Sequence, residues 1–268
     1  MDALAFTTSG QSGWSNVLFC SLLHFSTQII PFLGFIVMQG YFAEVHRRLV
    51  LQRPEPYLRF DFSDLSPYLS RGVVPFVVSL LVALPFGIVL GVLAIAVFIA
   101  AGLAAGAGTD EGLAMLVAFA GAGLVSIPLM AFWLVLTNAA VTRAELMGQV
   151  GKALDLGAIW SYGARTWKRA VLTGIVLWLL WFGLFIAGML ACFIGIFVTM
   201  TIGLIAQLHV RWQIYNEYLR NGGEPIELAP FEQLPSEAPR QPPPGPPPPG
   251  TWGTPPGYAG SPPGYAPP

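Results

Sequence analysis

The stretch Asp61–Arg71, DFSDLSPYLSR, decides how the chain is threaded. It is polar, contains the aromatic Tyr68, and leads directly into a long apolar run. A weaker copy, DLGAIWSYGAR at Asp155–Arg165, also leads into a long apolar run. Aromatic side chains at the edge of an apolar run are typical of the water–lipid boundary. Both segments are therefore predicted to be short interfacial helices that each lead into a membrane-spanning helix.

Three positions are identical between the two copies, and we treat these six residues as candidate functional residues. They are Asp61 and Asp155, Tyr68 and Tyr162, and Arg71 and Arg165. One explanation is a duplication that gives parallel repeats about an axis normal to the membrane. The other is that two interfacial segments share composition without common origin. The sequence leaves both explanations open.

Composition places most of the surface against lipid. Of the 268 residues, 54% are hydrophobic and only 10% are charged, whereas a soluble domain carries about 25% charged residues. So few charges cannot cover a water-facing surface, and the lipid bilayer is the expected surrounding. The formal net charge of −1 gives no general attraction to nucleic acid, so no nucleic-acid partner is expected.

Five segments are predicted to cross the membrane, because a helix needs about 20 apolar residues to do so. They are residues 15–39, 73–103, 113–136, 170–188 and 192–212. Pro31 predicts a kink in the first, and the second is expected to be one long helix through Pro85. The uncharged run Ala170–Leu208 is about twice too long for one crossing. A helical hairpin with its turn between Gly188 and Gly195 is therefore predicted.

The cations set the orientation. With five crossings, all 13 Lys and Arg residues fall on one side of the membrane. The positive-inside rule then places the N-terminus outside and the C-terminus in the cytoplasm, in a cell (cytoplasmic) membrane. A four-crossing alternative, with Ala170–Leu208 crossing once, would leave Arg211, Arg220 and Arg240 on the opposite side.

The composition changes after Arg220. Residues 1–220 are predicted to be a helical membrane domain, and residues 221–268 a disordered Pro/Gly-rich cytoplasmic tail. The tail holds two P-P-G-Y copies, Pro255–Tyr258 and Pro262–Tyr265. These match peptides that WW-type grooves bind; the alternative is a low-complexity arm. Either way, the tail is the expected contact for protein partners.

The first half resembles a family of uncharacterised prokaryotic membrane proteins, catalogued as domain of unknown function 4013. The residues that carry the resemblance, in order, are Pro31, Gly40, Tyr41, Arg47, Arg48, Pro54, Pro56, Asp64, Gly72 and Pro85. The resemblance covers roughly Ser15 to Arg220. The connection PEPYLRFDF, residues 54–62, departs from the family pattern. The family implies an integral membrane protein of a bacterial or archaeal cytoplasmic membrane, and it implies no reaction.

Ionisable groups inside the predicted spans are the expected carriers of membrane chemistry. His24 is the only such residue well within a predicted span. A proton relay is one interpretation; a neutral, hydrogen-bonded imidazole is favoured, because a relay needs a partner charge. Asp61, Asp64 and Asp155 are the candidate acids at the inner surface, and helix capping explains the last two. No metal-ligand spacing or nucleotide loop is found, so no metal or cofactor is expected.

These patterns favour an all-α polytopic membrane protein with a structural or interaction role, whose tail contacts partners. The alternative is a transporter or channel for a small or lipophilic molecule, with proline kinks at Pro31, Pro85 and Pro128 around a repeat axis. An enzyme is not expected, because no paired ionisable residues lie in the predicted spans.

Overall fold

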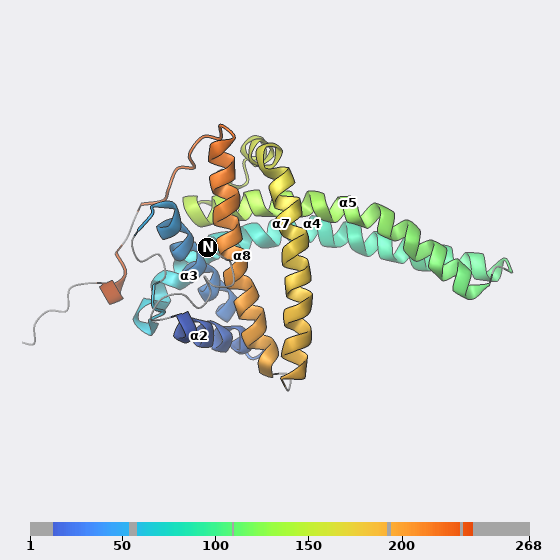
Figure 1. Ribbon diagram of the computed structural model, residues 1–268, viewed down its shortest axis with the longest axis horizontal. Helices are drawn as coiled ribbons and strands as arrows, with labels where there is room; N and C mark the ends of the chain where they lie inside the picture. The colour runs from blue at the N-terminus through green and yellow to red at the C-terminus, as the bar shows by residue number, and fades with distance from the viewer. Residues whose placement is uncertain (1–12, 54–57, 109, 192–193, 231–232, 238–268) are drawn as a thin grey trace, which may run out of the picture. The chain divides into compact units, whose positions relative to one another are not determined.

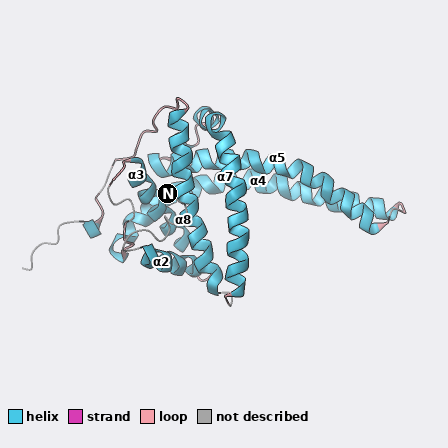
Figure 2. Ribbon diagram, viewed as in Figure 1, coloured by secondary structure: helices cyan, strands magenta, loops and turns pink. Residues whose placement is uncertain are grey.

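A computed structural model of the chain describes residues 13–53, 58–108, 110–191, 194–230 and 233–237. Within these ranges every regular element is a helix (Figures 1 and 2). The predicted all-α fold is therefore confirmed. The chain divides into two units, Met1–Glu232 and Gln233–Pro268. In the second unit the structure describes a single 3-10 turn, η2 (Pro235–Glu237).

The first unit contains seven α-helices and one 3-10 turn among its described residues. In chain order they are α2 (Gly13–Ser26), α3 (Leu33–Val50), η1 (Phe62–Asp64), α4 (Leu65–Gly106), α5 (Glu111–Met147), α6 (Val150–Ala153), α7 (Leu156–Leu190) and α8 (Ile194–Arg220).

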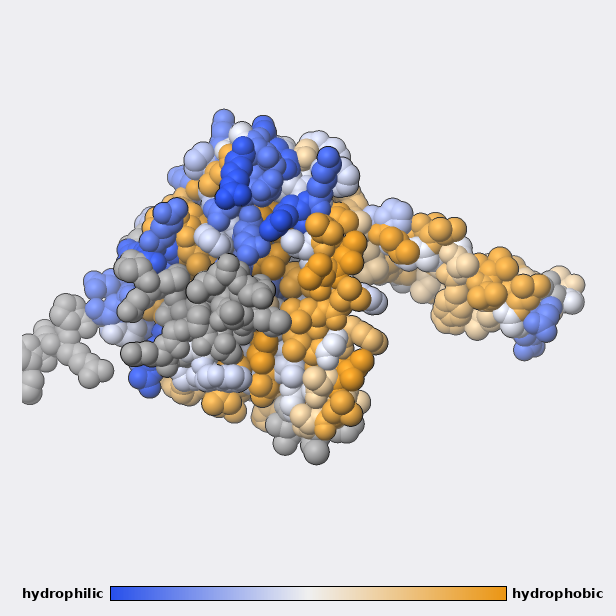
Figure 3. Space-filling model, in the orientation of Figure 1, coloured by the Kyte–Doolittle hydropathy of each residue, from blue (hydrophilic) through white to orange (hydrophobic). Residues whose placement is uncertain are grey.

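Four of these helices, α4, α5, α7 and α8, are long and apolar enough to cross a membrane. Figure 3 shows hydrophobic side chains along the paired α4 and α5 and over α7 and α8. As predicted, α4 runs as one helix through Pro85. At 1.5 Å per residue its 42 residues span about 63 Å, about twice the ~30 Å hydrocarbon core.

The two predicted interfacial helices are not separate elements, which corrects the sequence prediction. Residues 65–71 form the start of α4, and residues 156–165 form the start of α7. Each helix continues from this polar segment into its apolar run without a break, and α4 does so through Pro75. Asp155 caps α7 as predicted, accepting from the backbone N–H of Gly157 at 2.9 Å. Asp64 occupies the N-cap position of α4 without a side-chain capping bond.

The predicted hairpin in the second half is confirmed. α7 ends at Leu190 and α8 begins at Ile194, and the two helices pack side by side (Figure 1). Gly188 permits this close return of the chain. A Cβ added to Gly188 would lie 2.7 Å from the Cα of Ile196, which leaves no room for a side chain.

The predicted first span, residues 15–39, is not one kinked helix, and here the prediction is wrong. α2 ends at Ser26, a turn follows, and α3 starts at Leu33. The hydroxyl groups of Ser26 and Thr27 donate to the carbonyl oxygens of Leu23 and His24, at 2.7 and 2.6 Å. These bonds compete with the helix ladder, and Pro31 supplies no N–H to continue it.

Beyond this turn α3 runs back alongside α2. Asn16, near the start of α2, donates to the carbonyl oxygen of Leu58 at 2.8 Å. Tyr41, in the middle of α3, donates to the same oxygen at 3.0 Å. At the other end Gly34 lies against the backbone of Leu23. The two helices are thus antiparallel, and the start of α2 and the end of α3 lie toward the same end of the unit.

α3 is the central helix of the unit. It contacts α2, α4, α5 and α8, and every residue from Val37 to Leu49 is buried. That range includes Glu44, His46, Arg47 and Arg48. A helix buried on all sides is normally apolar, so these charged residues need partners within the protein.

Residues 221–230 follow α8 and pack on the helices. This segment is called the strap below. Ala229 donates its backbone N–H to the carbonyl oxygen of Leu146 at 2.8 Å. The Asn221 side chain donates to the carbonyl oxygen of Arg165, and Arg165 donates back to that of Asn221, each at 2.7 Å. The predicted boundary at residue 220 therefore lies too early, because the first unit extends to Glu232. The rest of the predicted disordered tail, residues 238–268, lies outside the described residues.

Candidate functional site

The Glu44 cluster consists of Glu44, Arg47, Arg48 and Arg71. The Glu44 carboxylate is fully buried. It accepts from Arg48 Nε at 3.0 Å and from Arg71 Nη1 at 2.7 Å, and Arg47 Nη1 lies 3.9 Å away. Arg48 stands one helical turn after Glu44 on α3, while Arg71 comes from α4. Charge-assisted hydrogen bonds of this kind offset the cost of burying the carboxylate.

The Glu145 cluster joins three helices. Glu145 lies near the end of α5 and is fully buried. One of its oxygens is 2.6 Å from Nδ1 of His46 on α3, and the other accepts from Nη1 of Arg211 on α8. Since α5, α3 and α8 meet at this carboxylate, Glu145 ties the two halves of the first unit together.

A close helix crossing brings α4 against α3 beside the Glu44 cluster. A Cβ added to Gly40 would overlap the carbonyl oxygen of Tyr68, and a Cβ added to Gly72 would overlap that of Ile36. The two glycines therefore let the backbones of the two helices touch. This contact carries Arg71 to within hydrogen-bond distance of Glu44.

A cavity of about 210 Å³ opens beside both clusters, and it is called the arginine cavity below. It lies among α3, α4, α5 and the strap. Its lining residues are Ala43, Arg47, Ser70, Arg71, Val74, Glu145, Gly148, Ala229 and Pro230. Arg47 also donates through Nη2 to the carbonyl oxygens of Ala229 and Pro230, the latter at 2.8 Å. The strap thus forms one wall of the cavity.

The structure separates the candidates of the first copy. Arg71 belongs to the Glu44 cluster, as described. Tyr68 is fully buried, donates to Asp64 at 3.4 Å, and packs edge-on against Tyr41. Asp61 caps the short turn η1, accepting from the backbone N–H of Ser63 at 2.8 Å. Of the three, Arg71 alone lines the arginine cavity.

The candidates of the second copy have structural partners. Asp155 caps α7, as described above. Tyr162 is buried and stacks on Tyr218 of α8, with ring centroids 4.6 Å apart. Arg165 is exposed and bonds to the strap, unlike its counterpart Arg71. The two copies thus share a capped helix start and a buried tyrosine, but their arginines have different partners.

His24 is not among the residues that pair with Glu44 or Glu145 in the described part of the chain. Its ring packs edge-on against Phe197 at the start of α8, with centroids 5.7 Å apart. Its Nδ1 is buried and has no hydrogen-bond partner among the described residues. Within the part of the chain that the structure describes, no group of three or more His, Cys, Asp or Glu side chains is placed to hold a metal ion.

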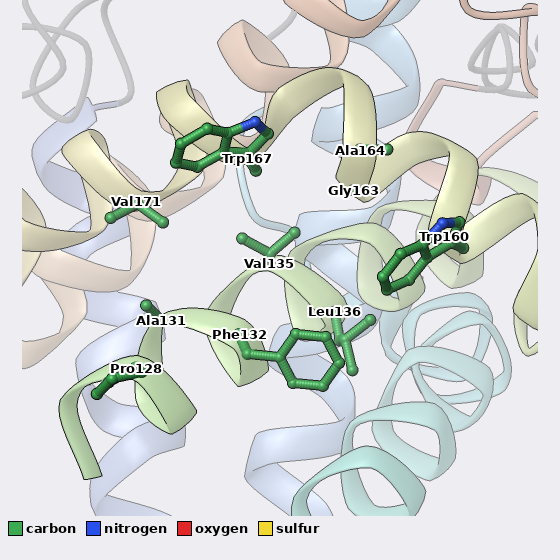
Figure 4. Close-up of a pocket in the computed structure, with 10 residues that line it drawn as sticks. All are labelled: Pro128, Ala131, Phe132, Val135, Leu136, Trp160, Gly163, Ala164, Trp167 and Val171. Atoms are coloured by element: carbon green, nitrogen blue, oxygen red, sulfur yellow. The ribbon is translucent and has the colours of Figure 1, made fainter. Parts of the chain in front are cut away.

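A second hollow, the apolar groove, lies between α5 and α7 (Figure 4). Its volume is about 470 Å³. It is lined by Pro128, Ala131, Phe132, Val135, Leu136, Trp160, Gly163, Ala164, Trp167 and Val171. Phe132 and the two tryptophans are more than 45% exposed. Such a lining suits an apolar chain and offers a charged ligand no partner.

Sequence reasoning missed the two buried glutamates. It placed Glu44 and Glu145 in polar connections facing water, whereas α3 and α5 continue beyond the predicted spans and bury them. The sequence does contain a signal for these two glutamates. Each glutamate follows an alanine at the end of an inward-running apolar segment, and Arg48 stands four residues after Glu44, the spacing of an ion pair within one helix.

Taken together, the helices and ionic clusters define an all-α protein with four helices suited to a membrane. The chain belongs to the family described as protein of unknown function DUF4013, whose model matches residues 23–208. The match includes both buried glutamates and ends three residues before Arg211. No curated protein and no solved structure matches the chain.

Proposed function

We propose that the protein is a multi-pass protein of a cytoplasmic membrane. α4, α5, α7 and α8 cross it, and the α2–α3 hairpin enters and leaves on one face. The tip of that hairpin exposes Ile29, Ile30 and Phe32, which suits lipid rather than water. Both buried ionic clusters then lie toward the cytoplasmic face, where the ends of the inward-running helices meet.

The proposed threading differs from the predicted five crossings only in the first segment, and this changes the side on which the N-terminus lies. Because α2 and α3 are antiparallel, both ends of that hairpin lie on the side of residues 51–61. All 13 Lys and Arg residues still fall on that side, so the positive-inside rule is satisfied equally well. The proposed orientation therefore has both termini in the cytoplasm, in place of an external N-terminus.

Cysteine labelling tests the orientation. In a background with Cys20 and Cys192 replaced by alanine, Ala107→Cys in the α4–α5 turn is expected to react with a membrane-impermeant maleimide on intact cells. Ser15→Cys at the start of α2 and Lys152→Cys are expected to react only after permeabilisation. External labelling of Ser15→Cys would restore five crossings, and protection of Ala107→Cys would overturn the orientation altogether.

The proposed role is non-catalytic: an interaction protein that recruits partners through its cytoplasmic tail. The observation that carries it is the division of the chain. Residues 233–268 form a unit separate from the helical one and contain both P-P-G-Y copies. The buried carboxylates of the helical unit, Glu44 and Glu145, are in contrast engaged by neighbouring Arg and His side chains, which supports a structural use for them.

Cross-linking in cells tests the role. A chain ending at residue 232 is expected to lose the cross-linked partners of the full chain while keeping its thermal midpoint, because the strap is retained. The matched control, Tyr258→Ala with Tyr265→Ala in the full chain, asks whether the P-P-G-Y copies carry the contact. Equal partner recovery with and without the tail would reject the recruiting role.

A carrier or transporter of a lipophilic molecule is the second candidate, and the apolar groove favours it. The groove has a volume of about 470 Å³ and an apolar lining that suits an acyl chain, and Pro128, Trp160 and Trp167 are among its lining residues. Transfer of fluorescent lipids between the leaflets of proteoliposomes distinguishes the candidates. Transfer that falls when Ala131→Trp fills the groove would favour this second function.

A further inference from the structure

We propose that the arginine cavity binds an anionic phosphate group, presented by a phospholipid headgroup or by a free phosphate. The cavity lies among α3, α4, α5 and the strap. It is lined by two guanidinium groups, Arg47 and Arg71, and by the hydroxyl-bearing Ser70. Planar guanidinium groups with several donors are the side chains best suited to phosphate oxygens.

An unused donor supports this assignment. Arg47 is only 5% exposed, and among the described residues its Nε–H is buried without a hydrogen-bond partner. Leaving a buried charged donor unpaired costs free energy, and this incompletely satisfied guanidinium lines the cavity. The other end of the guanidinium is held by the strap, so Arg47 is already fixed in place before any ligand arrives.

The local charge balance favours an anion. The two clusters contain four guanidinium groups, of Arg47, Arg48, Arg71 and Arg211, against the carboxylates of Glu44 and Glu145. A third buried carboxylate, Asp64, accepts from Tyr68, so these residues together hold four guanidinium groups and three carboxylates. Glu145 lines the cavity, but its two oxygens are engaged by His46 and Arg211.

The cavity is large enough for the group. Its volume of about 210 Å³ is many times the roughly 10–15 Å³ that a single water needs, so a phosphate with bound water fits. The site does not depend on the recruiting role proposed for the tail. Binding of a phospholipid headgroup depends on the proposed membrane location, whereas binding of a free phosphate does not.

The test uses the full chain in two settings. In detergent, inorganic phosphate is titrated and binding is followed by calorimetry. In nanodiscs, retention of phosphatidylglycerol over phosphatidylcholine is followed by native mass spectrometry. Binding in at least one setting is expected to weaken about tenfold or more in Arg47→Gln, the loss typical of one charge-assisted bond.

Two further variants keep the test decisive if Arg47→Gln fails to fold. Ser70→Trp fills the cavity from an exposed position without changing any charge, and is expected to abolish binding at an unchanged thermal midpoint. Arg169→Gln removes an exposed cation outside the cavity and is expected to bind as the parent does. Phosphate binding alone identifies a soluble ligand, and lipid selectivity alone identifies a headgroup. Absence of both, or full binding in Ser70→Trp, would overturn the proposal.

Discussion

Glu145→Ala is expected to cause a large loss of stability. The change removes the carboxylate that holds His46 and Arg211 and leaves the Arg211 guanidinium, 7% exposed, without its counter-charge. Breaking a buried ion pair from one side typically costs roughly 3–5 kcal/mol. The thermal midpoint of the detergent-solubilised protein, read by intrinsic fluorescence, should fall steeply.

Two companion variants separate charge burial from a general effect of mutation. Glu227→Ala removes a carboxylate that pairs with Lys152 at 2.8 Å in a solvent-exposed position, and surface pairs contribute little, so its midpoint should match the parent. Replacing His46, Glu145 and Arg211 together by leucine should recover much of the loss, because an apolar cluster needs no counter-charge. A triple variant as unstable as Glu145→Ala would contradict this account.

Gly72→Ala is also expected to lower stability markedly. An added Cβ overlaps the carbonyl oxygen of Ile36, which is backbone and cannot turn aside. α3 and α4 must separate, at a cost of about 1–3 kcal/mol for an overpacked contact, and Arg71 moves away from Glu44. The expected readouts are a lower thermal midpoint and faster proteolysis of the residue 51–61 connection.

Gly87→Ala on the same helix is the matched control. Gly87 is exposed, and a Cβ added there meets nothing within 4 Å. Alanine favours the helix over glycine by up to about 1 kcal/mol, so the midpoint should stay level or rise. Equal midpoints for Gly72→Ala and the parent would show that the α3–α4 contact is looser than the structure indicates.

Apolar length was the feature most readily predicted from sequence. The 39 uncharged residues from Ala170 to Leu208 are long for one crossing and have basic residues at both ends, which together predict a hairpin, and the structure has it. Residues 73–103 similarly formed one helix despite Pro85, because splitting the run would leave pieces too short to span. The same reasoning failed for residues 15–39, where length permits a crossing but Ser26, Thr27 and Pro31 turn the chain back.

The burial of charged residues was the feature that sequence reasoning missed. Glu44 and Glu145 lie outside the predicted spans and were not singled out from the sequence. Their burial depends on partners far along the chain: His46 is 99 residues from Glu145, and Arg211 is 66 residues beyond it. Periodicity and spacing carry no information about contacts at that distance, so only the folded arrangement reveals the site.

The strap has a consequence for the order of biosynthesis. Arg47 bonds to the backbone of Ala229, 182 residues later, so the wall of the arginine cavity cannot form until nearly the whole helical unit has left the ribosome. The Glu44–Arg71 pair, 27 residues apart, can close much earlier, since chains fold from the N-terminal end during synthesis. In a nascent chain stalled before residue 211, the Glu145 carboxylate can therefore pair with His46 on α3 but still lacks its bond to Arg211.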